Sequence, residues 1–365
     1  MRVDREGLIT ACLLTALLWG MHLVWLKRDT RPPVWDMALH QTYALNYLDA
    51  GEREGGGALR PWERSGNYPP FVHLAIAAVF FIFHPGPHVA VLANAPATLI
   101  LFWALFHLGR DLAGTAAARW TCILTALTPY MMWISRETLL DHWLSAWFAA
   151  FLVVLRKTRG FESRPWSLAL GVLLALGLLT KWFFAWLVLA PLAYVCVKYR
   201  LWKEQGRLLR LADALILAAA LAAPWYLPNL PGLVRLFGQN AEIGALEGEP
   251  PVFSFQSFIY YLRLLEGYQL FGLLFLVLVL ACFLVSRRGL LNDGGFLFWT
   301  VAAAWLMMTL LRTKDPRFTL SLLGPLAIVS GAWVQSWKRT RPGRAAQALL
   351  VAALGFQAYM VNFGI

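Results

Sequence analysis

The sequence is poor in charged residues. Asp, Glu, Lys and Arg make up 14% of its 365 residues, whereas hydrophobic residues make up 59%. A soluble domain carries about 25% charged residues. The composition therefore excludes an ordinary soluble domain and predicts an all-α, polytopic integral membrane protein.

Cysteine is also scarce, and its spacing excludes a cysteine-based metal or redox centre. The four cysteines each stand alone in or beside an apolar run, and they are Cys12, Cys122, Cys196 and Cys282. Zinc sites and redox pairs need closely spaced cysteines. We interpret these four as small residues packed between helices.

The sequence also lacks a cleavage site, an internal repeat and a Gly/Ser-rich or Pro-rich linker. The apolar run 8–26 is long enough to span a bilayer, so we expect an uncleaved first helix. We expect a single transmembrane domain over residues 1–365. Because the chain stops at Ile365 directly after a helix that exits outward, a fragment without its C-terminal periplasmic portion is one reading.

Basic residues gather between the apolar runs, which explains the formal net charge of +12 without a nucleic-acid partner. By the positive-inside rule, four clusters should face the cytoplasm. These clusters cover residues 156–164, 198–210, 287–288 and 338–344.

About eleven apolar runs approach the ~20 residues that a transmembrane helix needs. They are 8–26, 88–109, 116–134, 142–155, 166–179, 182–197, 211–230, 268–285, 294–311, 318–335 and 345–363. Both ends of the stretch 164–198 are basic, which predicts two short helices joined by an outer turn at Thr180-Lys181. Residues 71–83 are read as an interfacial or re-entrant helix of the first outer loop, with a short true span as the alternative.

Three predicted outer regions hold the polar residues that can carry chemistry, at 27–69, 135–141 and 231–267. Two basic groups break the positive-inside rule, and a bound phosphate would explain them. These groups are Lys27, Arg28 and Arg31, then Arg312, Lys314 and Arg317.

Asp36 is the leading candidate for catalysis. It follows Trp35 at the start of a possible surface helix, so it can also serve as a helix cap. His40 lies one helical turn later and can orient Asp36, hold a metal or simply lie at the interface.

Glu137 and Asp141 are the other candidate catalytic carboxylates. Their spacing of four predicts one helix face near the membrane boundary, where a carboxylate needs a partner. Arg136 is an alternative partner for either one. Lys181 either extends its ammonium to the interface or binds phosphate.

In this order the motifs resemble those of the GT-C superfamily of membrane glycosyltransferases, in the branch of the bacterial lipid A aminoarabinose transferase and the protein O-mannosyltransferase relatives. The matching segments cover nearly the whole chain and are Trp35-Asp36-Met37-Ala38, Asn67-Tyr68-Pro69-Pro70, Arg136-Glu137-Thr138-Leu139-Leu140-Asp141, Leu179-Thr180-Lys181-Trp182-Phe183, Ala223-Pro224-Trp225-Tyr226 and Lys314-Asp315-Pro316-Arg317-Phe318. Two positions depart from the family pattern: Met37 replaces the second acid of an Asp-Glu pair, and Tyr68 replaces a lysine.

The resemblance implies transfer of a hexosyl or pentosyl group from a polyprenyl-phosphate sugar to a lipid, protein or glycan hydroxyl. The active site would face the periplasm from the inner membrane, among membrane lipids. Asp36 would be the base, assisted by Asp141 and Glu137. His40, Tyr68, Lys181, Lys314 and Arg317 would bind substrate. The three carboxylates Asp36, Glu137 and Asp141 would suit a divalent metal ion. Some branches of the superfamily need no metal, so both alternatives stay open.

Other classes of membrane protein compete with this interpretation. A transporter or flippase for a lipid-linked or anionic substrate would place its ionisable residues near the bilayer midplane and commonly shows repeats. A purely structural subunit would not need carboxylates and cations gathered on one side. Lipid-linked polysaccharide polymerases and ligases are a close variant of the transferase.

Overall fold

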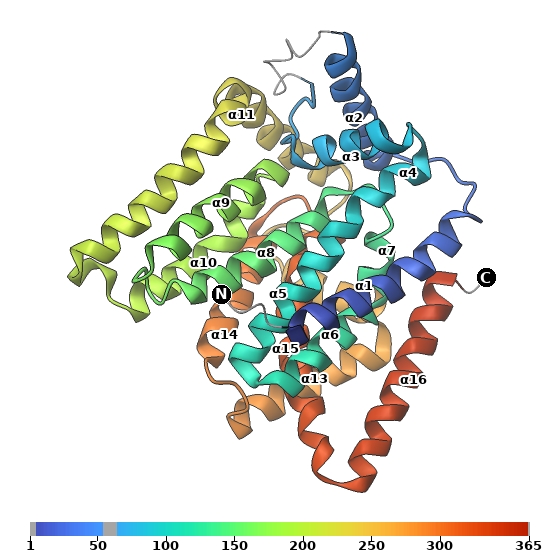
Figure 1. The fold of residues 1–365 in the computed structure, drawn as a ribbon, viewed down its shortest axis with the longest axis vertical. Coiled ribbons are helices and arrows are strands. Elements are labelled where there is room, and N and C mark those ends of the chain that lie inside the picture. Colours follow the sequence, from blue (N-terminus) through green and yellow to red (C-terminus); the bar gives the residue numbers. More distant parts are fainter. Residues whose placement is uncertain (1–4, 54–63, 364–365) are drawn as a thin grey trace.

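The structure, a computed structural model, describes residues 5–53 and 64–363, and the regular elements within those ranges are all helical (Figure 1). The helices are α1 Arg5–Leu26, α2 Asp36–Arg53, α3 Phe71–Phe83, α4 Pro87–Val91, α5 Ala95–Ala113, α6 Thr115–Ala126, α7 Pro129–Ile134, α8 Leu140–Lys157, α9 Arg164–Thr180, α10 Phe184–Lys198, α11 Gln205–Leu246, α12 Phe255–Leu264, α13 Phe271–Arg288, α14 Gly294–Leu310, α15 Leu320–Ser336 and α16 Arg341–Phe363. Short 3-10 or π turns lie between several of them, including Leu265–Gln269 and Pro316–Thr319.

The all-α, polytopic architecture is confirmed, because each of the eleven predicted apolar runs forms helix. Six helical stretches within the described residues are long and apolar enough to cross a membrane, and four shorter apolar helices accompany them. The shorter ones are α3, α9, α10 and α14. The count of about eleven crossings stays a prediction.

Proline explains where one predicted run is divided. Residues 116–134 form α6 and α7 instead of one helix, and Pro129 is the first residue of α7. The residue before a proline is driven out of the helical conformation, and Thr128 accordingly has extended backbone. The predicted turn at Thr180-Lys181 is confirmed, since α9 ends at Thr180 and α10 begins at Phe184.

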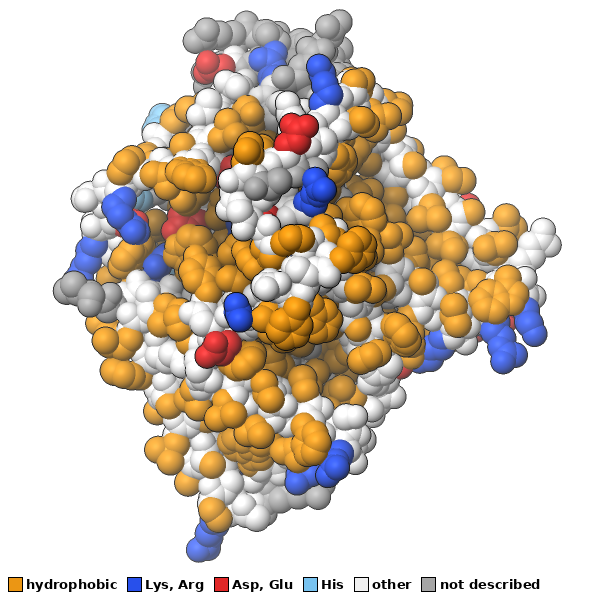
Figure 2. Space-filling model, turned by 180° about the vertical axis from the view of Figure 1, so that it is seen from behind, with side chains coloured by type: hydrophobic (Ala, Val, Ile, Leu, Met, Phe, Trp, Pro, Cys, Tyr) orange, Lys and Arg blue, Asp and Glu red, His pale blue; other side chains and the backbone are white. Residues whose placement is uncertain are grey.

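Charged residues gather at two opposite ends of the helix bundle. At one end Asp293, just before α14, accepts bonds from Arg156 of α8 (2.8 Å) and Lys198 of α10 (2.6 Å). The other end holds Asp36 at the start of α2 and Lys181 between α9 and α10. The predicted cytoplasmic clusters therefore lie at the end opposite Asp36. Figure 2 shows apolar side chains across the middle of one face and most Lys and Arg toward its rims.

The core is built on α8, which is buried along most of its length, and on its neighbours α5, α9 and α15, with α6 packed against α5 and α15. Glycines allow the closest approaches between helices. A Cβ atom at Gly331 of α15 would lie 2.8 Å from the backbone oxygen of Ala117 in α6, and one at Gly171 of α9 would overlap the backbone carbonyl of Ala214 in α11.

Gly171→Ala should lower the thermal unfolding midpoint of the purified protein. The added methyl group meets backbone, which cannot move aside, so the cost should be about 1–3 kcal/mol. Gly272→Ala is the matched control, because a Cβ at Gly272 of α13 meets nothing within 4 Å. Equal midpoints for the two variants would contradict the close packing of α9 on α11.

Candidate active site

A guanidinium group joins two carboxylates at the end of the bundle that holds Asp36. Arg317 Nη1 donates to Asp36 Oδ2 at 2.6 Å, and its Nε and Nη2 donate to Asp315 Oδ2 at 2.8 and 2.5 Å. Arg317 and Asp36 are 281 positions apart in the chain. Helix packing therefore creates this contact, and the Asp36 side chain remains 32% exposed.

The segment that carries Arg317 is held rigidly. Asp315 caps the 3-10 turn Pro316–Thr319 by accepting from the backbone N–H of Arg317 at 2.8 Å. Gln269, fully buried in the π turn Leu265–Gln269, donates to the Pro316 carbonyl at 2.5 Å and accepts from Thr319 Oγ1 at 2.9 Å. These contacts fix the guanidinium against Asp36.

A second ion pair lies beside the first. Lys181 Nζ donates to Asp141 Oδ1 at 2.8 Å, and the two side chains are only 11% and 2% exposed. Asp141 is also close enough to Arg317 for an electrostatic interaction. Phe183 stacks on Phe318 with ring centroids 4.7 Å apart, which joins the lysine turn to the arginine segment. We name Asp36, Asp141, Lys181, Asp315 and Arg317 the charged cluster.

Aromatic side chains from the first loop and α2 border the charged cluster. His40 and Tyr68 pack edge to face at 4.9 Å, and His40 Nδ1 lies 3.0 Å from His73 Nε2 of α3. Burial, with Lys181 and Arg317 nearby, lowers the pKa of His40 to about 3. A neutral imidazole therefore lies beside the cluster at neutral pH. Burial and the charge of Asp36 raise the pKa of Tyr68 to about 12.

Lys314 does not point toward the charged cluster. Its Nζ donates to the carbonyls of Thr309 (2.6 Å), Leu311 (2.6 Å) and Met308 (3.3 Å), at the end of α14. An ammonium group has three donors, and these carbonyls occupy them. Lys314 therefore caps a helix in this structure, whereas Arg317, three residues later, faces Asp36.

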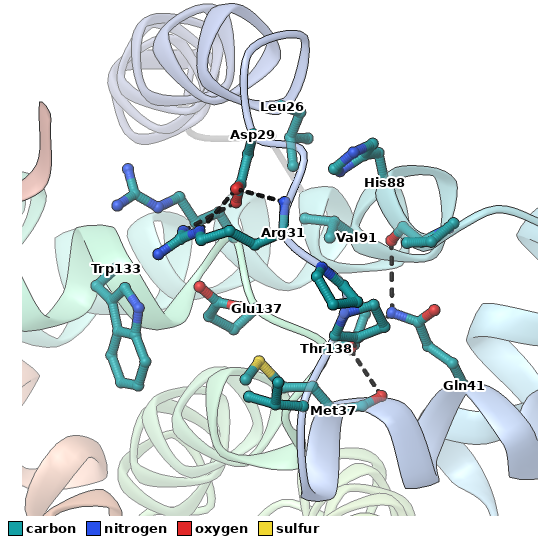
Figure 3. Close-up of a pocket in the computed structure, with 15 residues that line it drawn as sticks. Leu26, Asp29, Arg31, Met37, Gln41, His88, Val91, Trp133, Glu137 and Thr138 are labelled. Carbon is teal, nitrogen blue, oxygen red and sulfur yellow. Dashed lines mark hydrogen bonds and ion pairs between the residues drawn. The ribbon is translucent and has the colours of Figure 1, made fainter.

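Glu137 also lies apart from the charged cluster, and it does not share a helix face with Asp141. The chain leaves helical conformation between α7 and α8, so Glu137 lies in a turn. It lines a separate pocket of about 220 Å³ with Asp29, Arg31 and Thr138 (Figure 3). We call this the loop pocket. The predicted i, i+4 geometry is wrong because the helix begins only at Leu140.

The loop pocket gives a pH-dependent prediction. Burial, partly offset by Arg136 and Arg31, raises the pKa of Glu137 from 4.5 to about 7. A raised acid pKa stabilises the fold below the unfolded-state value, and this contribution is lost as pH rises through the folded value. The unfolding midpoint of wild type relative to Glu137→Gln should therefore fall between pH 5 and pH 8. If the unfolding midpoints of the two proteins change equally with pH, the raised pKa of Glu137 is contradicted.

The candidate metal ligands do not converge. Asp36 and Asp141 belong to the charged cluster, where Arg317 and Lys181 contact them, and Glu137 faces the loop pocket. Within residues 5–53 and 64–363, no group of three or more His, Cys, Asp or Glu side chains is arranged to hold a metal ion.

The sequence interpretation gave no role to Asp315 or Gln269. The Asp-Pro-Arg order is a usable signal for Asp315, because an aspartate before a turn commonly accepts from the backbone N–H two residues later. Gln269 gives no comparable signal, since its contacts to Pro316 and Thr319 come from a distant part of the chain.

Comparison with known proteins finds similar sequences. A family model described as dolichyl-phosphate-mannose-protein mannosyltransferase matches residues 67–227. The chain is 30% identical over 203 residues to an undecaprenyl phosphate-alpha-4-amino-4-deoxy-L-arabinose arabinosyl transferase of Pseudomonas fluorescens, a match covering 53% of this chain and 36% of that protein.

Solved structures show the same fold. ArnT from Cupriavidus metallidurans bound to undecaprenyl phosphate superposes with a TM-score of 0.66 at 20% identity, over 96% of this chain and 64% of that one. An Archaeoglobus fulgidus oligosaccharyltransferase gives 0.58 at 15% identity, over 98% and 52%. The resemblance to GT-C glycosyltransferases is confirmed. The chain spans about a third of the length of the curated relative and just under two thirds of that of ArnT.

Proposed function

We propose that this chain, whose fold resembles that of GT-C glycosyltransferases, transfers a sugar from a polyprenyl-phosphate donor to an acceptor hydroxyl. The observation that carries the proposal is the charged cluster, in which the partly exposed Asp36 carboxylate pairs with the Arg317 guanidinium beside the buried Lys181–Asp141 ion pair. Two solved structures of similar fold support a lipid phosphate, since one holds undecaprenyl phosphate and the other a dolichol-phosphate.

Asp36 is the proposed general base. Its carboxylate takes the proton of the acceptor hydroxyl while the acceptor oxygen bonds to the anomeric carbon. The bond from that carbon to the phosphate oxygen breaks, and its electron pair leaves with the polyprenyl phosphate. One displacement inverts the anomeric carbon, and the phosphate gains the negative charge that Asp36 loses.

Arg317 and Lys181 are the proposed phosphate ligands. Preorganised cations aimed at a leaving group stabilise charge as it develops. Protonation of Asp36 weakens its hold on Arg317 Nη1, which frees that donor for the phosphate as its charge grows. Asp315 keeps the guanidinium in place meanwhile through Nε and Nη2. Asp141 orients Lys181.

Tyr68 and neutral His40 are proposed to contact the sugar, because they border the cluster without adding charge. We place the reaction at the periplasmic face of the inner membrane, because the charged cluster lies opposite the basic ends that the positive-inside rule assigns to the cytoplasm. We assign the reaction to the single membrane domain of residues 1–365.

A donor panel tests the proposal. Purified protein in detergent is mixed with labelled polyprenyl-phosphate hexoses and pentoses and with a membrane extract as acceptor. We expect label to move from one donor to an acceptor band, with polyprenyl phosphate released in equal amount. An intact protein that transfers from none of these donors would contradict the proposed activity.

A further inference from the structure

A large apolar groove lies between α1 and α16, away from the charged cluster. Its volume is about 790 Å³, and its walls include Leu17, Val24 and Tyr359. Both helices are long and apolar enough to span a membrane, and only 28% of the apolar stretch of each is buried. The two helices converge at their ends, where Trp25 meets Phe363 at 5.6 Å (Figure 1).

Cationic side chains line one end of this groove. Arg28 and Arg31 line it just after α1 ends, and Asp29 pairs with Arg31 at 2.7 Å. Arg28 is exposed and makes no ion pair with the described residues. These arginines belong to the group that breaks the positive-inside rule, and they have no role in the proposed reaction. An apolar groove with arginines at one end has the shape and charge that suit an anionic lipid.

Arg136 is an independent sign of an anionic ligand. Its side chain is 5% exposed, and its Nε and Nη1 are buried without a hydrogen-bond partner. The guanidinium lies over Trp25 at 4.2 Å and over Phe363 at 5.1 Å, both of which line the groove, while Arg136 itself lines the adjoining loop pocket. A buried guanidinium with unused donors is costly unless a ligand satisfies them.

The groove and the loop pocket meet at shared residues. Asp29 and Arg31 line both. The carboxyl groups facing this region are those of Asp29, already paired, and Glu137. Three guanidinium groups therefore face two carboxyl groups, and charge complementarity favours an anion over a zwitterion.

We propose that the α1–α16 groove holds one anionic glycerophospholipid, with its acyl chains along Leu17 and Gly20 and its phosphate between Arg28 and Arg136. This lipid is separate from the polyprenyl donor. The turn that carries Arg136 also holds Ser135, whose Oγ lies 2.7 Å from His22 of α1, and Thr138, which donates to the Met37 carbonyl in α2. The bound lipid therefore supports the turn that leads into Asp141.

Gly20→Leu tests the site without disturbing the fold. A Cβ at Gly20 meets no protein atom within 4 Å, so the new side chain fills the groove. Delipidated protein is titrated with phosphatidylglycerol or phosphatidylcholine of the same acyl chains, and bound lipid is counted by native mass spectrometry. We expect wild type to retain one phosphatidylglycerol at least ten-fold more tightly than phosphatidylcholine. Gly20→Leu should lose it, and the matched control Gly272→Leu should keep it.

Further variants and competitors distinguish an anionic phospholipid from other possible occupants of the groove. Arg28→Gln should lose the preference for phosphatidylglycerol, and Arg164→Gln should keep it, because Arg164 is an exposed arginine at the opposite end of the bundle. Equal retention of both lipids by wild type, or full retention by Gly20→Leu, would overturn the proposal. Displacement of the bound lipid by undecaprenyl phosphate, or a dimer that forms in its place, would also overturn it. Each result is independent of sugar transfer.

Discussion

Asp36→Asn should lower kcat/KM for sugar transfer by about 10²–10⁴, the range that removal of a general base usually costs. Asparagine has nearly the same shape and can still accept from Arg317 Nη1, but it cannot take a proton from the acceptor. The unfolding midpoint should therefore change little. The measurement is the initial rate of label transfer from the donor that the panel identifies, at equal protein concentration.

Asp111→Asn is the matched control for this prediction. Asp111 also pairs with an arginine, Arg156, but at the opposite end of the bundle. The same chemical change at that end should leave the transfer rate within a few-fold of wild type. If Asp36→Asn transfers as fast as Asp111→Asn, Asp36 is not the base.

Lys181→Met should lower the transfer rate by about 10²–10³, the loss expected when one preorganised group that stabilises developing charge is removed. It should also lower stability by about 3–5 kcal/mol, because it leaves the Asp141 carboxylate buried without its partner. Both the transfer rate and the unfolding midpoint must be measured, because a lower rate can come from a lost phosphate ligand or from a less stable protein.

The double variant Asp141→Asn/Lys181→Met separates these explanations. Removing both charges eliminates the uncompensated carboxylate, so most of the lost stability should return. Transfer should stay low, because the phosphate ligand is still missing. Recovery of transfer together with stability would make the pair structural only. Arg164→Met, which breaks an exposed pair with Asp213 at 3.9 Å, should change neither quantity measurably.

Hydrophobic runs and charge placement were enough to predict most of the helices. The predicted outer region 231–267 is an exception, because it contains the end of α11 and all of α12. The eleven runs are helical, the turn at Thr180-Lys181 lies where the basic clusters require it, and Asp36 begins a helix that also carries His40. These features depend on local sequence. Length and apolar composition decide where a helix forms, and basic residues decide which ends share a side.

Side-chain partners across the bundle could not be predicted in the same way. Lys314 and Arg317 are both cations in one short segment, yet Lys314 donates to carbonyls at the end of α14, whereas Arg317 reaches Asp36, 281 positions away. Glu137 and Asp141 share a motif, yet after the break before Leu140 Glu137 faces the loop pocket and Asp141 pairs with Lys181. Contacts that join residues hundreds of positions apart depend on tertiary packing.

Reconstitution into liposomes tests the central claim most directly, because it distinguishes covalent transfer from transport. Labelled polyprenyl-phosphate sugar and an acceptor are placed in the outer leaflet of sealed vesicles, and the sugar–acceptor product and label protected in the lumen are both counted. We predict product formation that is lost with Asp36→Asn, with no gain in protected label. Label that accumulates inside without forming product would contradict the account and support a transporter.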